Sequence, residues 1–314
     1  MNRCAAWFLA FALLVPAALA KDKAKKKPPE PDDPGKGVNF YSLDRELTLG
    51  RGMAQEVERE SRLLDDPVVT EYINRIGQNV VRNSDAKLPF TIKVIDSDEI
   101  NAFALPGGFL FVDTGLVLRA ENEAELAGVM AHEIAHVAAR HGTRQASRAQ
   151  IVNYASIPLI FMGGWAGYAV RQIAALAVPM GFLQFSRAFE AQADYLGLQY
   201  VDRSGYDPTA FVDFFEKIET LEKRQPGAIA RAFSSHPMTA TRIRNAQKEI
   251  QNDLQARPQY VLDTSEFHDV KARLASLQNR RVLSQSWTDL PVLKKRPRAS
   301  STEPEDDPAP RKKN

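Results

Sequence analysis

The stretch "AELAGVMAHEIAHVAARHG" (Ala124–Gly142) decides the fold. Asn122 stands just before it and can cap a helix with its side chain. We therefore predict a helix that runs from Glu123 to about His141, with Gly142 as its stop. Within this helix two histidines lie a single turn apart, with a glutamate beside the first.

His132 and His136 are two of only five histidines in the chain. Residues four apart on a helix share one face, with Cβ atoms about 6 Å apart, so both rings can reach one ion at Zn–N distances of about 2.0–2.1 Å. Glu133 is rotated by about 100° from His132. It lies beside the ion, where it can take a proton from a bound water molecule. The pattern predicts one Zn²⁺ per chain and Glu133 as general base; the alternative is a pair of ordinary helix histidines.

Zinc in a catalytic site needs a third protein ligand and one open position. "SRAFEAQADYLG" (Ser186–Gly197) offers Glu190 and Asp194, four apart on one helical face, in a setting too apolar for idle carboxylates. Glu190 completes a His, His, Glu set, and Asp194 can accept a hydrogen bond from a ligating imidazole. The histidine helix can receive a second helix closely, because its face carries the small residues Ala131, Ala135 and Ala139.

Together these residues describe a hydrolase that cleaves peptide bonds without a covalent intermediate. Zinc makes a bound water acidic near neutral pH, and the glutamate acts as general base before passing the proton to the leaving amine. No Ser-His-Asp or thiol arrangement competes for this role. The net charge of +2 is spread along the chain and gives no case for nucleic-acid binding.

The remaining pattern predicts an α+β fold that is mostly α, with a small sheet placed before the histidine helix. Asp66 and Pro67 form a helix start, and "LPFTIKVID" (Leu88–Asp96) alternates as a strand. "NAFALPGGFLFVDTG" (Asn101–Gly115) indicates two short strands joined at residues 106–108. From there the pattern is helical almost to the end of the folded part.

The two ends of the chain differ from its middle. Residues 1–20 have the charge, apolar run and small-x-small ending of a cleaved signal peptide, the alternative being an uncleaved anchor. Residues 21–39 and 291–314 are charged and proline-rich, which predicts a disordered linker and tail. The folded part is then residues 40–290. Cys4 is the only cysteine and leaves with the signal.

Four motifs in order carry a resemblance: "NAFALPGGFLFVDTGL" (Asn101–Leu116), "AHEIAHVAARH" (Ala131–His141), "FEAQADYLG" (Phe189–Gly197) and "SSHPMTATRI" (Ser234–Ile243). From about residue 40 to residue 277 the chain resembles the zinc metallopeptidase family of the prenyl-protein proteases and HtpX-like peptidases, in its exported BepA-like branch. The resemblance implies a zincin fold of the gluzincin type. The BepA-like members carry a helical repeat domain after the protease, and we expect no such array here.

The resemblance implies ligands at His132, His136 and Glu190, a base at Glu133 and an assisting role for Asp194, in agreement with the residues themselves. It also implies that the histidine of the His-Pro motif lies near the metal. There it stabilises the oxyanion, or it occupies the open zinc position and makes the resting enzyme latent. The alternative for this residue, His236, is a structural turn.

Two further features leave alternatives open. The strand that begins at Asn101 either pairs with an extended substrate at the cleft or is an ordinary hairpin of the core. Residues 151–185 are apolar and separate the two halves of the metal site. They form a buried hairpin or lid, contact a membrane peripherally, or span one. His141 and His268 receive no role.

We therefore expect an exported zinc metalloendopeptidase in the periplasm of a Gram-negative bacterium, acting on misfolded, stalled or misassembled envelope proteins, with membrane association as an open alternative. Compartment and substrate come from the resemblance and the signal peptide. One rival is a chaperone or assembly factor near the outer membrane whose zinc site is held latent by His236. The other is an inner-membrane peptidase anchored by residues 151–185.

Overall fold

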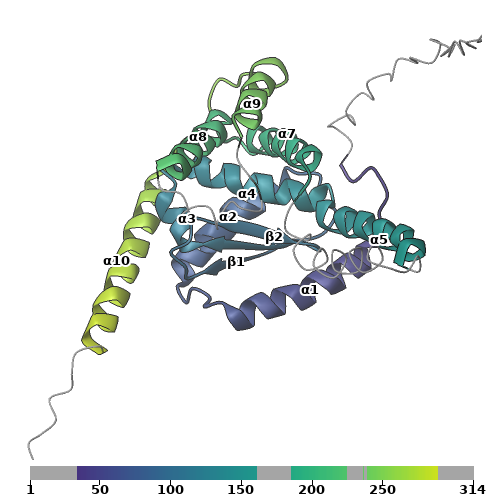
Figure 1. Cartoon of the computed structure of the whole chain (residues 1–314). Helices are drawn as coiled ribbons and strands as arrows, with labels where there is room; N and C mark the ends of the chain where they lie inside the picture. The colour runs from purple at the N-terminus through teal and green to yellow at the C-terminus, as the bar shows by residue number, and fades with distance from the viewer. Residues whose placement is uncertain (1–33, 161–184, 225–235, 237–238, 289–314) are drawn as a thin grey trace, which may run out of the picture.

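A computed structural model describes residues 34–160, 185–224, 236 and 239–288 of the chain (Figure 1). Its elements, in chain order, are α1 (Leu43–Glu60), α2 (Pro67–Arg82), β1 (Thr91–Ile95), β2 (Ala102–Leu105), β3 (Phe109–Asp113), α3 (Thr114–Arg119), α4 (Glu123–Ala138), α5 (His141–Ile160), α7 (Arg187–Arg203), α8 (Thr209–Arg224), α9 (Ala240–Asn252) and α10 (Ser265–Thr288). The described part is mostly helical with one small sheet, which confirms the predicted fold class.

The sheet has the strand order β1-β3-β2. β3 pairs in parallel with β1 and antiparallel with β2, and Phe103 lies opposite Phe111 in the second pair. The β2–β3 hairpin turns at residues 106–108, as predicted. Among the described residues, β2 pairs only with β3. Its other edge faces α4, where the N–H of Ala104 donates to Glu133 Oε2.

Helices cover both faces of the sheet (Figure 1). α1 packs on one face, where Ala54 meets Ile95, Leu105 and Phe111 in a small buried cluster. α2 and α4 pack on the other face in the main core, and α7 and α8 cover the far side of α4. α4 therefore lies in the middle of the molecule, between the sheet and α7.

α4 is buried along almost its whole length, including both of its histidines and Glu133. α7 approaches it very closely, since a Cβ added at Gly197 would lie 3.3 Å from the Cα of His132. The small residues predicted to allow this approach are all fully buried: Ala131, Ala135 and Ala139.

The predicted helix starts are correct. Asp66 caps α2 by accepting a hydrogen bond from the N–H of Val69, and Asn122 caps α4 by accepting one from the N–H of Glu125. α7 begins in the same way, with Ser186 as its cap. These short polar side chains accept from N–H groups that have no partner inside the helix.

The predicted end of the histidine helix is wrong. α4 stops at Ala138, and Gly142 lies inside α5 rather than after a stop. The break falls at Arg140, whose φ of 57° is the left-handed conformation that usually requires glycine. Contacts of its guanidinium with Glu46 Oε1 and the carbonyl oxygen of Tyr41 hold it there. The backbone turn is thus fixed by partners far away in the sequence.

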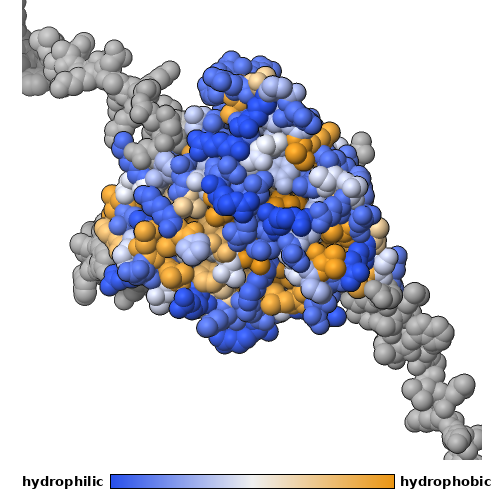
Figure 2. All heavy atoms as spheres, turned by 180° about the vertical axis from the view of Figure 1, so that it is seen from behind, coloured by the Kyte–Doolittle hydropathy of each residue, from blue (hydrophilic) through white to orange (hydrophobic). Residues whose placement is uncertain are grey.

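The predicted signal peptide, the predicted tail and residues 161–184 of the apolar segment lie outside the described residues. Within the described ranges, no helix combines the length and apolar character needed to cross a membrane. The last residue of the predicted linker and the first residue of the predicted folded part both contact α5: Asn39 Nδ2 donates to Thr143 Oγ1, and the N–H of Phe40 donates to Ser147 Oγ. Seen from behind, hydrophobic residues gather toward the left of the described surface and hydrophilic ones dominate its upper part (Figure 2).

Candidate metal centre

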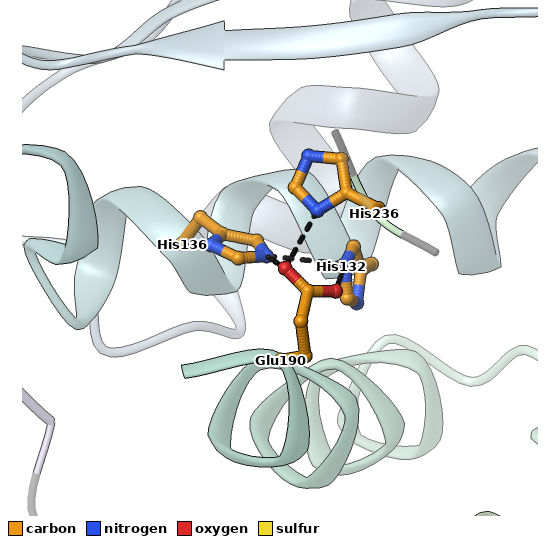
Figure 3. A group of neighbouring side chains, drawn as sticks. All are labelled: His132, His136, Glu190 and His236. Atoms are coloured by element: carbon orange, nitrogen blue, oxygen red, sulfur yellow. Dashed lines mark hydrogen bonds and ion pairs between the residues drawn. The ribbon is translucent and has the colours of Figure 1, made fainter. Parts of the chain in front are cut away.

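Four buried side chains from three separate segments converge beside α4 (Figure 3). His132 and His136 point from α4 toward α7, and their Nε2 atoms are 3.1 Å apart. Glu190 of α7 faces both rings: its Oε2 atom is 3.6 Å from His132 Nε2, and its Oε1 atom is 3.6 Å from His136 Nε2. His236 completes the group, its Nδ1 atom 2.9 Å from Glu190 Oε1. The structure thus brings together all three predicted ligands and the histidine of the His-Pro motif.

The predicted helper, Asp194, lies behind His132 rather than in the group itself. Its Oδ1 atom is 3.2 Å from His132 Nδ1, the ring nitrogen that faces away from the convergence point. Arg242 of α9 holds this carboxylate with two hydrogen bonds, at 2.7 and 2.6 Å. The same guanidinium is 2.8 Å from Glu190 Oε2. One arginine therefore contacts both buried acidic residues of α7.

Electrostatics make this group attractive to positive charge. Burial would raise the pKa of Asp194, but the charges and hydrogen bonds of Arg242 and His132 together outweigh burial and lower it. The pKa of Glu190 is also lowered, because the surrounding histidines outweigh its burial. Burial would lower the pKa of His132, but the two carboxylates raise it to about 9. Burial and the charge of His132 hold the pKa of His136 well below its ordinary value. The carboxylates stay ionised and favour a cation where the rings meet.

Glu133 lies on the sheet side of the same group. Its Oε2 atom accepts a hydrogen bond of 3.2 Å from the N–H of Ala104, in the edge strand β2. Its Oε1 atom is 3.7 Å from His236 Nε2. This carboxylate therefore sits between the histidine group and the free edge of the sheet, next to the ligand atoms but not among them.

A small cavity of about 20 Å³, close to the size that holds one water molecule, opens next to the group. Ala104 and Pro106 of the β2–β3 hairpin, His136 of α4 and Phe185 are among its lining residues. The cavity runs from the metal-facing histidine to the end of the edge strand. An extended chain bound along β2 would lie next to this cavity.

The sequence did not indicate two residues that contact the group. Arg242 is separated from Asp194 by 48 positions, and no local pattern relates them. His141 is fully buried, and its Nδ1 atom lies 3.0 Å from Nδ1 of His136. Burial lowers the pKa of His141 to about 3, so its ring is neutral. His268, by contrast, pairs with Asp263 on the surface, away from the site.

The group fits a tetrahedral divalent cation. Zinc bonds of about 2.0–2.1 Å to nitrogen and oxygen place tetrahedral ligand atoms about 3.3–3.4 Å apart. One atom each from His132, His136, Glu190 and His236 lies within 4.8 Å of the others, all four residues being buried. Two imidazoles and a carboxylate on two helices, with an acidic residue beside them, are the donor set of a catalytic zinc site.

Fold and site together define a metallopeptidase: a His-Glu-x-x-His helix beside an edge strand, with a carboxylate supplied by a second helix. The comparison with protein families agrees. The model of peptidase family M48 matches residues 67–250, and the chain belongs to this family. The match includes both metal helices and ends inside α9.

Similar proteins come from bacteria and from mitochondria. The chain is 31% identical over 261 residues to the beta-barrel assembly-enhancing protease of Escherichia coli K12, covering 79% of this chain and 52% of that protein. It is 31% identical over 215 residues to the mitochondrial metalloendopeptidase OMA1 of Schizosaccharomyces pombe, covering 67% of this chain and 62% of that protein. The chain spans about half the length of the first of these relatives.

Proposed function

We propose that this protein is a zinc-dependent endopeptidase with one Zn²⁺ per chain. His132, His136 and Glu190 are the proposed ligands and Glu133 the general base. The observation that carries the proposal is the convergence of the three ligand side chains, from two helices, with the glutamate beside them. Family membership supports metal-dependent peptide hydrolysis as the reaction. The choice of zinc rests on the donor set.

The residues of the chain divide the work of hydrolysis. When bound, zinc supplies Lewis acidity, which polarises a peptide carbonyl and makes a water molecule acidic near neutral pH. Glu133 takes the proton of the attacking water and delivers it to the leaving amine. Asp194 is the proposed positioning group for His132, with its Oδ1 atom 3.2 Å from the Nδ1 atom of that ring. The lowered pKa of Asp194 supports this role, because an ionised carboxylate is the better acceptor.

The edge strand is the proposed binding track for substrate. The carbonyl of Asn101 accepts from the N–H of Asp113 in β3, whereas the N–H of Ala104 points to the opposite side, toward Glu133. Alternate residues of β2 thus face an added chain at this edge, where Glu133 holds the N–H of Ala104. Such pairing selects extended or unfolded substrate rather than one sequence.

His236 decides between an active and a latent resting state. With its ring nitrogen 2.9 Å from Glu190 Oε1, it is near enough to act as a fourth ligand. A ligand there would exclude the water that hydrolysis needs. This geometry favours one rival function, a chaperone or assembly factor with a closed zinc site. The other proposed role of the same ring is to stabilise the oxyanion.

The proposed substrates are unfolded, stalled or misassembled proteins of the cell envelope, reached in the periplasm of a Gram-negative bacterium. The name of the Escherichia coli relative, the beta-barrel assembly-enhancing protease, supports this substrate class. The signal-like residues 1–20 support export. We place the peptidase domain at residues 40–290 and propose that its apolar segment, residues 151–185, is either a lid over the site or a contact with a membrane surface.

The test is cleavage of unfolded casein by purified protein carrying zinc. We compare wild type with Glu133→Gln and His236→Ala. The first variant should bind zinc normally and lose activity by about two to four orders of magnitude, the usual contribution of a general base. The second should cleave faster than wild type if His236 closes the site. Equal inertness of all three zinc-loaded proteins would favour the binding protein.

A further inference from the structure

A second buried network stands behind the other metal-facing histidine. His141 lies between His136 and Gln192, with its Nδ1 atom 3.0 Å from His136 Nδ1 and its Nε2 atom 3.0 Å from Gln192 Oε1. The ring of His141 also stacks on Phe189, with 4.3 Å between ring centroids. The proposed ligands and general base do not include His141. The inference below concerns the metal site of the proposed function and rests on it.

The break at Arg140 is what makes this contact possible. On a continuous helix, a residue five positions after His136 is rotated by about 500°, which is 140° away from it. The left-handed turn at Arg140 ends α4 and starts α5 in a new direction. His141, the first residue of α5, is thereby folded back against the last turn of α4. The left-handed turn at Arg140 therefore brings the ring of His141 against that of His136, a proposed metal ligand.

The direction of each hydrogen bond in this network follows from Arg144. Its guanidinium can only donate, and its Nη1 atom lies 3.3 Å from the side-chain oxygen of Gln192. That contact fixes the amide with its oxygen toward His141. His141 must then carry its proton on Nε2, so its Nδ1 atom is an acceptor. The facing Nδ1 atom of His136 must be the donor.

We infer that His141 is a positioning residue that fixes the tautomer of His136. With its proton held on Nδ1, His136 keeps the lone pair of Nε2 toward the point where the ligands converge (Figure 3). The two histidines of α4 are thus oriented by different groups. His132 faces an ionised carboxylate, Asp194, whereas His136 faces a neutral imidazole, which is a weaker acceptor. This partner leaves His136 the less basic ligand of the two.

The tautomer itself is the first test, and it requires no metal. Protein labelled only at histidine nitrogens gives few signals, because the chain has five histidines. Two-bond ¹⁵N–¹H correlation spectra of the metal-free protein at neutral pH report which ring nitrogen carries the proton. A His136→Gln spectrum assigns the signals of that ring. We expect His136 protonated on Nδ1 and His141 on Nε2. The opposite pattern in wild type would overturn the inference.

Zinc affinity is the second test, measured by competition with a fluorescent chelator. His141→Phe keeps a ring but has no acceptor, and we expect the zinc Kd to rise about ten- to a hundredfold. His141→Asn places an amide oxygen near the position of Nδ1 and should restore most of the affinity. A merely structural role predicts no such rescue, and equal Kd values for wild type and His141→Phe would contradict the inference.

A variant pair at Gln192 keeps the inference testable if His141→Phe does not fold. Gln192→Glu retains the acceptor for His141 Nε2–H and should bind zinc like wild type. Gln192→Leu removes that acceptor and should weaken zinc binding, with both tautomers of His141 in its spectrum. Unchanged affinity and one tautomer in Gln192→Leu would overturn the inference. A wild-type protein that binds no zinc would instead overturn the proposed function, while the spectra still report the tautomers.

Discussion

Arg242 sets the charge balance around the two buried acidic residues of α7, Glu190 and Asp194. Asp194 and Glu190 are both buried, and each would carry a large desolvation penalty as an ion without a partner. The guanidinium hydrogen-bonds Asp194 through two nitrogens and contacts Glu190 through the third. Its flat fork suits this arrangement, whereas a lysine has one charged point. Arg242 thus helps to keep Asp194 ionised in the interior and places a positive charge beside Glu190.

Replacing Arg242 with methionine should destabilise the protein by about 3–5 kcal/mol, because it leaves buried carboxylates without their partner. Arg242→Lys should recover only part of this loss. Urea unfolding of the metal-free protein measures both changes. The matched control is Arg244→Met on the same helix, whose exposed side chain bonds only locally to Thr241 and should cost little. Similar small losses at both positions would contradict the role given to Arg242.

Asp113, at the end of β3, gives the fold a dependence on pH. Burial, with a smaller contribution from the charge of Glu99, raises the pKa of its carboxyl to about 7. The native state thus holds a proton that the unfolded state has released above pH 4. Its contribution to stability is full below that pH and is lost as pH rises through 7.

Asp113→Asn should remove this dependence. The side chain makes no capping hydrogen bond to α3, so the amide loses no cap. At pH 8 the variant should be more stable than wild type by an amount on the order of 1–3 kcal/mol. At pH 4 the difference should vanish. Urea unfolding at both pH values, with chelator present, measures it. A constant difference across this range would show that the carboxyl titrates as an ordinary one.

At the scale of elements, the metal group depends on how closely α7 lies on α4. His132 and His136 come from one helix and Glu190 from the other, so the distance between the axes sets the distance between ligands. Gly197 allows the backbones to approach, two turns after Glu190. A Cβ at this position would touch the backbone N and Cα of His132 at 3.3 Å.

Gly197→Val should therefore push the helices apart. We expect a loss of about 1–3 kcal/mol from overpacking, together with weaker zinc binding because Glu190 moves away from the histidines. Gly52→Ala is the control, since nothing lies within 4 Å of a Cβ there and the helix α1 should gain up to about 1 kcal/mol. Chemical unfolding and chelator competition measure both effects. Normal zinc affinity in Gly197→Val would contradict this account of the packing.

Local patterns predicted those elements whose causes are local. Asp66 and Asn122 were identified as helix starts because a capping side chain acts within three residues of its own position. The end of α4 was misplaced because Gly142 resembled a stop, whereas the turn occurs at Arg140. Partners nearly 100 positions away hold that arginine in the left-handed conformation. The spacing of residues along the sequence does not predict contacts between positions this far apart, so the end of α4 could not be predicted from it.

The same distinction holds for the site across the whole molecule. His132, Glu133 and His136 follow from the periodicity of one helix, and Glu190 and Asp194 from that of another. The structure places the side chains of His132 and His136 opposite that of Glu190. The backbone N–H of Ala104 and the side chains of Arg242 and His141 were not predicted as neighbours, because tertiary packing alone brings them there. Arginine and histidine are common on protein surfaces and at helix ends, so their residue types alone did not indicate a place in the site.

At the scale of the whole molecule, a bound metal should couple elements that are distant in the chain. The proposed ligands join α4 to α7, and His236 lies before α9, so a cation binds the folded arrangement and not the separated segments. Zinc at a hundred times its Kd should stabilise the fold by about 2.7 kcal/mol. For a domain of this size that is a rise in Tm of roughly 5–11 °C. Glu190→Gln keeps the shape but loses the ligand charge, and its Tm should respond far less. Calorimetry with zinc and with chelator measures both; an equal rise in wild type and Glu190→Gln would place the cation elsewhere.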